Sequence, residues 1–196
     1  MPDRSNLLPE PAADADLKSQ LWERMARIGD QVHATQFGQL IDPLLQQVLE
    51  QGFKEAGAHE GTVWLLDAAG EYLEPAFNSG PRAGQIVGRF KQPLNSGLIS
   101  MVFASEQSFI ENDISRNVQQ SKLLDTQLQV KTHALIAVPF HFLRACRGVI
   151  SCVQLKPTAP DAPQPAGFHP AHLAAVQRST TALAQLVECR LLKQDL

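Results

Sequence analysis

The chain has 196 residues, of which 44% are hydrophobic, so it can bury the core of one domain of roughly 150 residues together with extra helices or tails. Its net charge of −3 provides no basic excess for a phosphate backbone, which argues against nucleic acid as the main partner. No membrane span, no signal-peptide pattern and an odd number of cysteines (three) lead us to expect a cytoplasmic protein without a disulfide framework.

The N-terminal region divides into a tail and a helix. Residues 1–15 are rich in Pro, Ala and Asp, which predicts a disordered tail. Over residues 16–37 the spacing predicts a helix whose narrow apolar seam follows steps of 4, 4, 3 and 4, at Leu17, Leu21, Met25, Ile28 and Val32. Such a seam is typical of a helix that pairs with a partner helix, and it equally suits packing on the helix's own domain.

A second helix is predicted to begin at Asp42 and Pro43, because Asp suits the cap and Pro suits the first helical position. It should end near Gly57. Its expected buried face consists of Leu44, Leu45, Val48, Leu49 and Phe53. Residues 62–66 and 72–77 then alternate around a turn, which predicts a β-hairpin.

The stretch 95–113, NSGLISMVFASEQSFIEND, should contain a helix capped by Asn95 or Ser96 and then a short strand at 109–110. A further short strand is expected at 88–90. Residues 113–131 are polar and loosely helical, which is typical of a lid or of a plain connection, and their expected apolar anchors are Leu123, Leu124 and Leu128.

The last part of the chain predicts the centre of a sheet. Two near-continuous apolar runs, THALIAVPFHF and RGVISCVQL, should pair as buried strands around a loop at 143–146. Residues 157–167 are too rich in proline for a helix or a strand, and a long helix should run from 169 to the end. Hairpin-linked strands with helices at both ends of the chain indicate an α+β layer architecture.

Five segments between Gln39 and Glu188 resemble, in order, the GAF domain family of small-molecule sensor modules. The segment IDPLLQQVLEQGFKEAG resembles the entry helix of that family, and GTVWLLDAAGEYLEPAF resembles its first hairpin. The segment NSGLISMVFASEQSFIENDI resembles the family's glycine-helix-turn-strand segment. Its central strands resemble ALIAVPFHF with RGVISCVQL, and its closing helix resembles FHPAHLAAVQRSTTALAQLVE. The resemblance implies a GAF domain over 38–196. It also implies a PAS-related, six-stranded antiparallel sheet with the N- and C-terminal helices on one face and a ligand pocket on the other.

The residues that bind the known ligands of this family are not fully matched in this chain. Members that bind cyclic nucleotides carry Asn-Lys, followed later by Phe, any three residues and Asp-Glu. At the matching positions this chain has Leu155-Lys156, Phe168 and His172-Leu173, so the Lys and the Phe remain and the Asn and both acids are absent. Bilin-binding members and free methionine sulfoxide reductases use cysteines of the lid or pocket, but Cys146, Cys152 and Cys189 fall elsewhere. No histidine cluster has metal-ligand spacing, and no nucleophile-base pair stands out, so we expect neither a metal site nor an enzyme.

We therefore interpret the chain as a signalling domain that binds an unidentified small molecule under the helix near Ser96 and the lid. The expected ligand contacts are Phe77, Asn78, Ser96, Gly97, Leu98, Asn112, Asp113, Arg116, His133 and Ser151. A homodimer formed by the terminal helices, or a separate output protein, would relay the signal, with no nucleic acid or membrane partner. The alternative is a dimerisation module without a ligand. A more remote alternative is an enzyme of this fold with unfamiliar catalytic residues.

Overall fold

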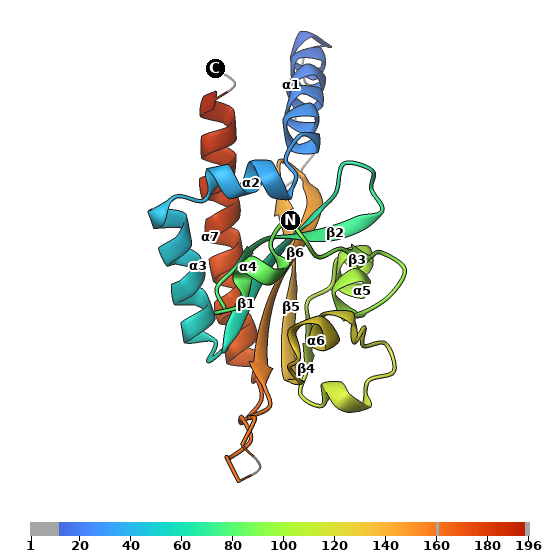
Figure 1. Ribbon diagram of the computed structural model, residues 1–196. Helices are drawn as coiled ribbons and strands as arrows, with labels where there is room; N and C mark the ends of the chain where they lie inside the picture. Colours follow the sequence, from blue (N-terminus) through green and yellow to red (C-terminus); the bar gives the residue numbers. More distant parts are fainter. Residues whose placement is uncertain (1–11, 160, 195–196) are drawn as a thin grey trace, which may run out of the picture.

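The computed structural model describes residues 12–159 and 161–194, so the disorder predicted for the tail 1–15 lies outside the described part over residues 1–11. Residues 12–15 of that predicted tail instead begin a helix. Within the described part, α2 (Ala34–Leu40), α3 (Pro43–Glu55) and α7 (Pro170–Gln194) lie on one side of a curled sheet, and α1 (Ala12–Asp30) extends away from one end of the domain (Figure 1). No helix of the described residues is long and apolar enough to cross a membrane.

The sheet has six strands in the order β3-β2-β1-β6-β5-β4, and every neighbouring pair is antiparallel. The strands are β1 (Glu60–Leu66), β2 (Tyr72–Asn78), β3 (Gln92–Pro93), β4 (Phe109–Glu111), β5 (Thr132–Phe142) and β6 (Ala145–Leu155). Both predicted hairpins and the α+β class are confirmed. The loop between β5 and β6 is shorter than predicted, because Leu143 and Arg144 make the turn with φ values of 47° and 67°, as two-residue hairpin loops require.

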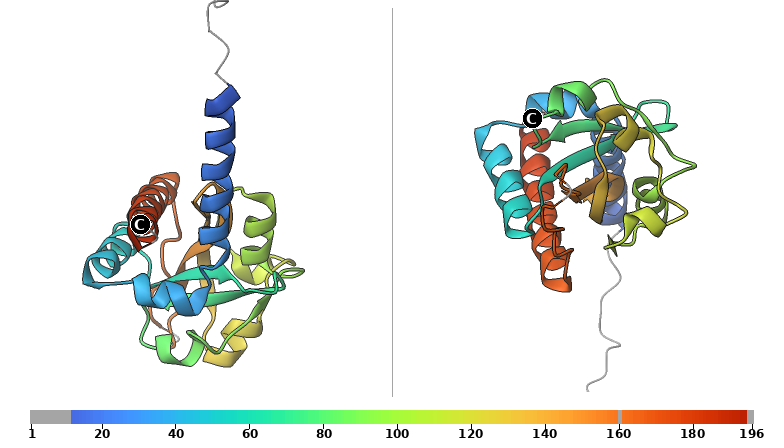
Figure 2. Two further views of the ribbon diagram at one scale, coloured as in Figure 1. Left: turned by 90° about the horizontal axis from the view of Figure 1, so that it is seen from above. Right: turned by 60° about the horizontal axis from the view of Figure 1, so that its bottom comes forward.

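The main core lies between the sheet and the helices α2, α3 and α7, so helices from both ends of the chain cover one face (Figure 2). Phe37 of α2 packs edge-on against Phe140 of β5, with ring centroids 5.9 Å apart, and both rings are fully buried. Leu49 of α3 and Leu183 of α7 are also fully buried in this core. Since apolar burial dominates folding free energy, this layer supplies most of the stability.

The opposite face of the sheet is covered by shorter elements: α4 (Ala83–Ile86), α5 (Leu98–Ser105), a 3-10 turn (Ile114–Arg116) and α6 (Leu123–Leu128) (Figure 1). A second apolar cluster joins them to the sheet through Trp64, Leu98, Val102 and Leu135. These covering elements are short and joined by loops, so the space between them and the sheet is filled less completely than the main core.

The helix boundaries near the N-terminus differ in part from the predictions. The single helix expected over 16–37 is instead two helices, because the chain turns after Asp30 so that Val32 and Phe37 both reach the core. The second helix begins as predicted, with the Asp42 carboxylate accepting from the Leu45 N–H at 2.9 Å. Leu44, expected on its buried face, is 54% exposed.

Corrections also apply around α5. The strand expected at 88–90 is absent, and the chain pairs two residues later as β3. Gly97 is the N-cap of α5 at φ 88°, and neither Asn95 nor Ser96 provides a side-chain cap. The Gln92 amide instead donates to the Ser96 carbonyl oxygen at 2.7 Å, which holds the chain in the tight approach that only glycine adopts easily. Of the three predicted lid anchors, Leu123 is 53% exposed, whereas Leu124 and Leu128 face inward.

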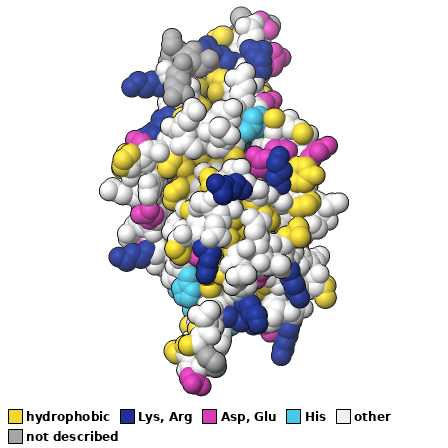
Figure 3. All heavy atoms as spheres, viewed as in Figure 1, with side chains coloured by type: hydrophobic (Ala, Val, Ile, Leu, Met, Phe, Trp, Pro, Cys, Tyr) yellow, Lys and Arg dark blue, Asp and Glu magenta, His cyan; other side chains and the backbone are white. Residues whose placement is uncertain are grey.

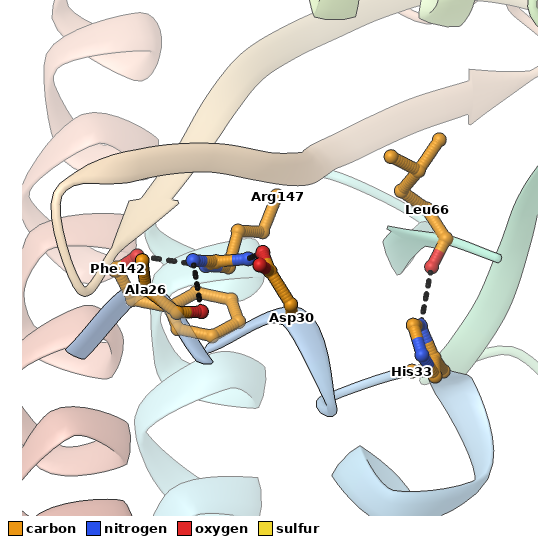
Figure 4. Close-up of polar contacts among 6 residues, drawn as sticks. All are labelled: Ala26, Asp30, His33, Leu66, Phe142 and Arg147. Carbon is orange, nitrogen blue, oxygen red and sulfur yellow. Dashed lines mark hydrogen bonds and ion pairs between the residues drawn. The ribbon is translucent and has the colours of Figure 1, made fainter. Parts of the chain in front are cut away.

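Helix α1 projects from the body of the domain and is anchored at its C-terminal end by Arg147 of β6 (Figures 2 and 4). The Arg147 guanidinium donates to the Phe142 carbonyl at 3.2 Å, to the Ala26 carbonyl at 3.3 Å and to the Asp30 carboxylate at 2.7 Å. A Cβ at Gly29 would lie 2.2 Å from this guanidinium, so glycine makes the approach feasible. One arginine thus joins the end of α1 to the central strand β6.

Candidate functional site

A partly enclosed cavity of about 90 Å³ lies between the sheet and its covering elements. Alternate residues of a strand face the same side, and three such residues of β1, Glu60, Thr62 and Trp64, form part of its floor. The rest of the floor comes from β2, β5 and β6: Asn78, Thr132, Leu135, Ser151, Val153 and Leu155. The strand period therefore brings a row of polar side chains to a face that is otherwise apolar.

The roof of the cavity comes from α4, β3, the N-terminus of α5 and the segment 114–130. Its lining residues are Ile86, Gln92, Gly97, Leu98, Ile99, Ile114, Gln120, Ser121, Leu124, Asp125, Leu128 and Val130. The cavity is much larger than the ~10–15 Å³ that one water molecule needs and smaller than a typical ligand pocket of roughly 300–1,000 Å³. It therefore suits a molecule of a few heavy atoms, or one end of a larger molecule.

Hydrogen bonds hold the floor and the roof in place. The Trp64 indole N–H donates to the Ser151 hydroxyl at 2.9 Å, and the Asn78 amide donates to the Thr62 hydroxyl at 2.9 Å. The Asp125 carboxylate accepts from the Thr132 backbone N–H at 2.9 Å and from its hydroxyl at 2.7 Å. Through Asp125 the roof segment is fastened to the first residue of β5.

Glu60 is the most unusual residue of the floor because it is acidic and yet only 8% exposed. Burial raises the pKa of its carboxyl above the usual range, while the charges of Arg82 and His59 act in the opposite direction. Among the described residues, only the Asn78 amide approaches it as a hydrogen-bond donor, and that amide also donates to Thr62. A carboxylate so placed favours a partner that brings a hydrogen-bond donor or a positive charge.

The structure brings four of the ten expected contact residues to this cavity: Asn78, Gly97, Leu98 and Ser151. Phe77 packs against the main core on the other face, as its place next to Asn78 in a strand requires. Ser96 is exposed, and His133 is half-buried outside the lining. Both ends of the Asn112 side-chain amide bind Phe168, accepting from its N–H at 2.7 Å and donating to its carbonyl at 2.9 Å. Asp113 and Arg116 form an exposed ion pair at 3.1 Å.

Sequence reasoning missed the residues that bring most of the polarity, namely Glu60, Gln92, Asp125 and Thr132. One signal was available, since the alternation of Thr62 and Trp64 in the strand predicted at 62–66 reaches Glu60 when it is continued two residues towards the N-terminus. No local signal marks Asp125, which reaches Thr132 only when the segment 114–130 folds over the sheet. Among the described residues, no group of three or more His, Cys, Asp or Glu side chains is placed to hold a metal ion.

Comparisons with known proteins agree with this architecture. The GAF domain model matches residues 41–187, and no curated protein matches the chain. The GAF domain of a phosphoenolpyruvate-protein phosphotransferase from Coxiella burnetii is similar at a TM-score of 0.62 and 17% identity, over 89% of this chain and 99% of that chain. A GAF domain/HD domain protein from Geobacter sulfurreducens gives 0.59 at 14% identity, over 81% and 95%.

A third similar structure is the free methionine-R-sulfoxide reductase from Neisseria meningitidis in complex with its substrate, with a TM-score of 0.55 and 16% identity over 78% of this chain and 92% of that chain. At these identities the structural likeness establishes the fold. The family model matches residues 41–187, which is most of the chain. The chain belongs to the GAF domain family.

Proposed function

We propose that this chain is a cytoplasmic regulatory domain that binds a small molecule in the cavity between its sheet and residues 96–131. GAF domains commonly act as sensors in signalling proteins, and the solved relatives include a methyl-accepting chemotaxis protein and a domain of DevS. The observation that carries the proposal is the cavity itself, in which a few polar groups converge on apolar walls.

The positions of the cysteines favour binding over catalysis. Cys152 is fully buried in the main core, on the other face of the sheet, and burial raises the pKa of its thiol. Cys146 lies outside the cavity lining, and its thiol has a pKa raised to about 11, so it is a poor nucleophile at neutral pH. Cys189 is exposed on α7. None of the three lines the cavity, which supports a regulatory role in place of thiol chemistry.

Filling the cavity is expected to abolish ligand binding without unfolding the protein. Val153 lines the floor, and in the Val153→Phe variant the ring would occupy the space of the ligand. Such a filled variant should keep its thermal midpoint within a few degrees of that of the wild type, since cavity filling offsets local strain. Thermal shift in a metabolite library is the measurement.

The matched control is Val118→Phe, because Val118 is 99% exposed. It should respond to the same compounds as the wild type. If no compound shifts the wild-type midpoint, or if Val153→Phe responds equally well, the proposed pocket is wrong.

A second proposed role is homodimerisation through the projecting helix α1. Its seam is continuous: Met25 and Ile28 pack on the main core, whereas Leu17 and Leu21 are 67% and 52% exposed. A second copy would present the same seam at the same spacing, and two such helices bury each other's leucines in a coiled coil. The dimer would place helices next to β6, through which cavity occupancy can be relayed.

Charge placed on this seam is expected to break the dimer. The Leu17→Glu, Leu21→Glu double variant should elute as a monomer in size-exclusion chromatography with light scattering at about tens of micromolar, a concentration at which weak dimers assemble. Leu123→Glu serves as control, since Leu123 is 53% exposed on α6, far from the terminal helices. A monomeric wild type at this concentration would contradict the proposal.

A further inference from the structure

The acidic character of the cavity is set by two carboxylates. Glu60 and Asp125 line the cavity, and no Lys, Arg or His side chain does. Asp125 is occupied, because its two oxygens accept from Thr132. Glu60 is 8% exposed, and among the described residues its hydrogen-bond donor is the shared Asn78 amide, while the charges of Arg82 and His59 act on it from the groove side. Of the two carboxylates, Glu60 is therefore the one with oxygens left for a ligand. A protonated nitrogen is the partner that best offsets the cost of burying such a charge.

A groove of opposite character adjoins the cavity. It has a volume of about 680 Å³ and is lined by His59, Arg82, Lys131 and Lys156, with no Asp or Glu among its lining residues. Val130 and Leu155 line both the groove and the cavity, so the two spaces share a wall. Figure 3 shows Lys and Arg side chains gathered at the lower end of the molecule, where the first residues of β5 and the end of β6 lie.

The charges of this groove are available to a ligand. Neither Lys131 nor Lys156 forms an ion pair with a described residue. The Lys156 N–H donates to the Lys131 carbonyl at 2.7 Å, which holds the two lysines on adjacent strand ends. The His59 Nδ1 accepts from the Leu155 N–H at 3.0 Å, so the neutral ring carries its proton on Nε2 and is a further donor. These groups suit a carboxylate or a phosphate.

The two charge signs lie close together along the sheet. Glu60 pairs directly with Val153 of β6, and Lys156 follows three residues later, immediately after the end of that strand. A simple cation approaching Glu60 would pass Arg82 and the lysines, which repel it, whereas a simple anion would meet the Glu60 carboxylate inside the cavity. A molecule that carries both charges avoids both penalties.

We infer that the cavity and the basic groove together bind a small amphoteric molecule, with a protonated nitrogen against Glu60, a short apolar body, and a carboxylate or phosphate at Lys131 and Lys156. This inference rests on the proposed sensor function and names the ligand class of the same site. It accounts for a largely buried carboxylate in the cavity and for two lysines without a described ion-pair partner in the adjoining groove, because Val130 and Leu155 line both spaces.

Calorimetric titration of the full chain tests the inference with defined probes. The amphoteric probes are glycine, β-alanine, 4-aminobutanoate and O-phosphoethanolamine, and the single-charge probes are propylammonium and propionate. At least one amphoteric probe should bind about tenfold or more tightly than either single-charge probe, and the best chain length reports the span between the two charges. Comparison of the carboxylate probes with the phosphate probe shows which of the two anionic groups the groove prefers.

Matched variants assign each end. Glu60→Gln should reduce affinity for the best probe about tenfold or more, as should the Lys131→Gln, Lys156→Gln double variant, because each removes one charge pair. Glu71→Gln and Lys54→Gln, which alter exposed charges elsewhere, should bind like the wild type. Should Glu60→Gln fail to fold, titration of the wild type and of His59→Gln at falling pH replaces it. Affinity should then decline in both proteins as the pH falls and Glu60 takes up a proton. Because Arg82 stays charged, Asn78 stays neutral and His59 is absent from the variant, the shared decline is assigned to Glu60.

The outcomes separate this inference from the proposed function. Equal binding of propionate or propylammonium, or unchanged binding by Glu60→Gln, overturns the amphoteric class. If a library compound without both charges binds in the cavity and no amphoteric probe does, the sensor function stands and this inference fails. If no compound of either set binds, both fail together.

Discussion

Replacing Gly148 with alanine is expected to destabilise the protein by about 3 kcal/mol, in the upper part of the range for overpacked cores. A methyl carbon at this position would lie 1.9 Å from the Trp64 carbonyl oxygen and 3.0 Å from a Leu65 methyl group. Gly148 is buried where β6 pairs with both β1 and β5, so backbone must move in the centre of the sheet. The same shift would displace Trp64 from its bond to Ser151 on the cavity floor. Urea denaturation gives the free energy of unfolding.

The control for this prediction is Gly38→Ala. Nothing lies within 4 Å of a Cβ at Gly38, which is an exposed position in α2. Alanine there should stabilise the protein by about 0.5–1 kcal/mol, since it removes the entropic cost of a helical glycine. Similar stabilities for Gly148→Ala and the wild type would show that the sheet accommodates the methyl group, contrary to this prediction.

Replacing Arg147 with alanine is expected to release the C-terminal end of α1 and to cost about 1–3 kcal/mol locally. The side chain of Arg147 is 10% exposed and binds two backbone carbonyls as well as Asp30, and its guanidinium lies 5.6 Å from the centre of the Phe142 ring (Figure 4). Asp30 is 72% exposed, so solvent screens the ion pair and most of the effect comes from the carbonyl bonds and packing. Hydrogen exchange of the α1 amides is the measurement.

Arg116→Ala serves as the comparison, because Arg116 is 87% exposed and forms a surface pair with Asp113. That change should alter stability by less than about 0.5 kcal/mol. The prediction for Arg147 fails if α1 exchanges at the same rate in Arg147→Ala as in the wild type. It also fails if the whole domain, and not α1, exchanges faster.

The predictions that succeeded rest on interactions between near neighbours in the chain. Asp42 and Pro43 predict a helix start because the cap bond to Leu45 spans three residues. The apolar runs of β5 and β6 predict a central hairpin because strands joined by a short loop pair with each other. The expectation for α1 and α2 was wrong because burial of Val32 and Phe37, contributed by distant strands and helices, overrode the local helical period.

The candidate site was predictable in location more than in composition. Resemblance to the family pointed to the space under α5, and Asn78, Gly97, Leu98 and Ser151 do line it. Asn112 did not follow, because its side-chain amide binds Phe168, 56 residues away in the chain. Contacts of this kind depend on how loops cross the sheet, and they leave no periodic trace in the residues themselves.

The amino-acid sequence by itself determined the α+β class, the two hairpins and the order of the main helices, since these depend on hydrophobic period and on capping between residues a few positions apart. Only the tertiary structure decided that Glu60 is buried beside a basic groove and that Arg147 anchors α1. Burial and charge proximity are set by side chains that converge from β1, β6, α1 and the segment 114–130. Whether Glu60 remains a solvated acid or becomes a ligand contact is therefore decided by packing across the whole sheet.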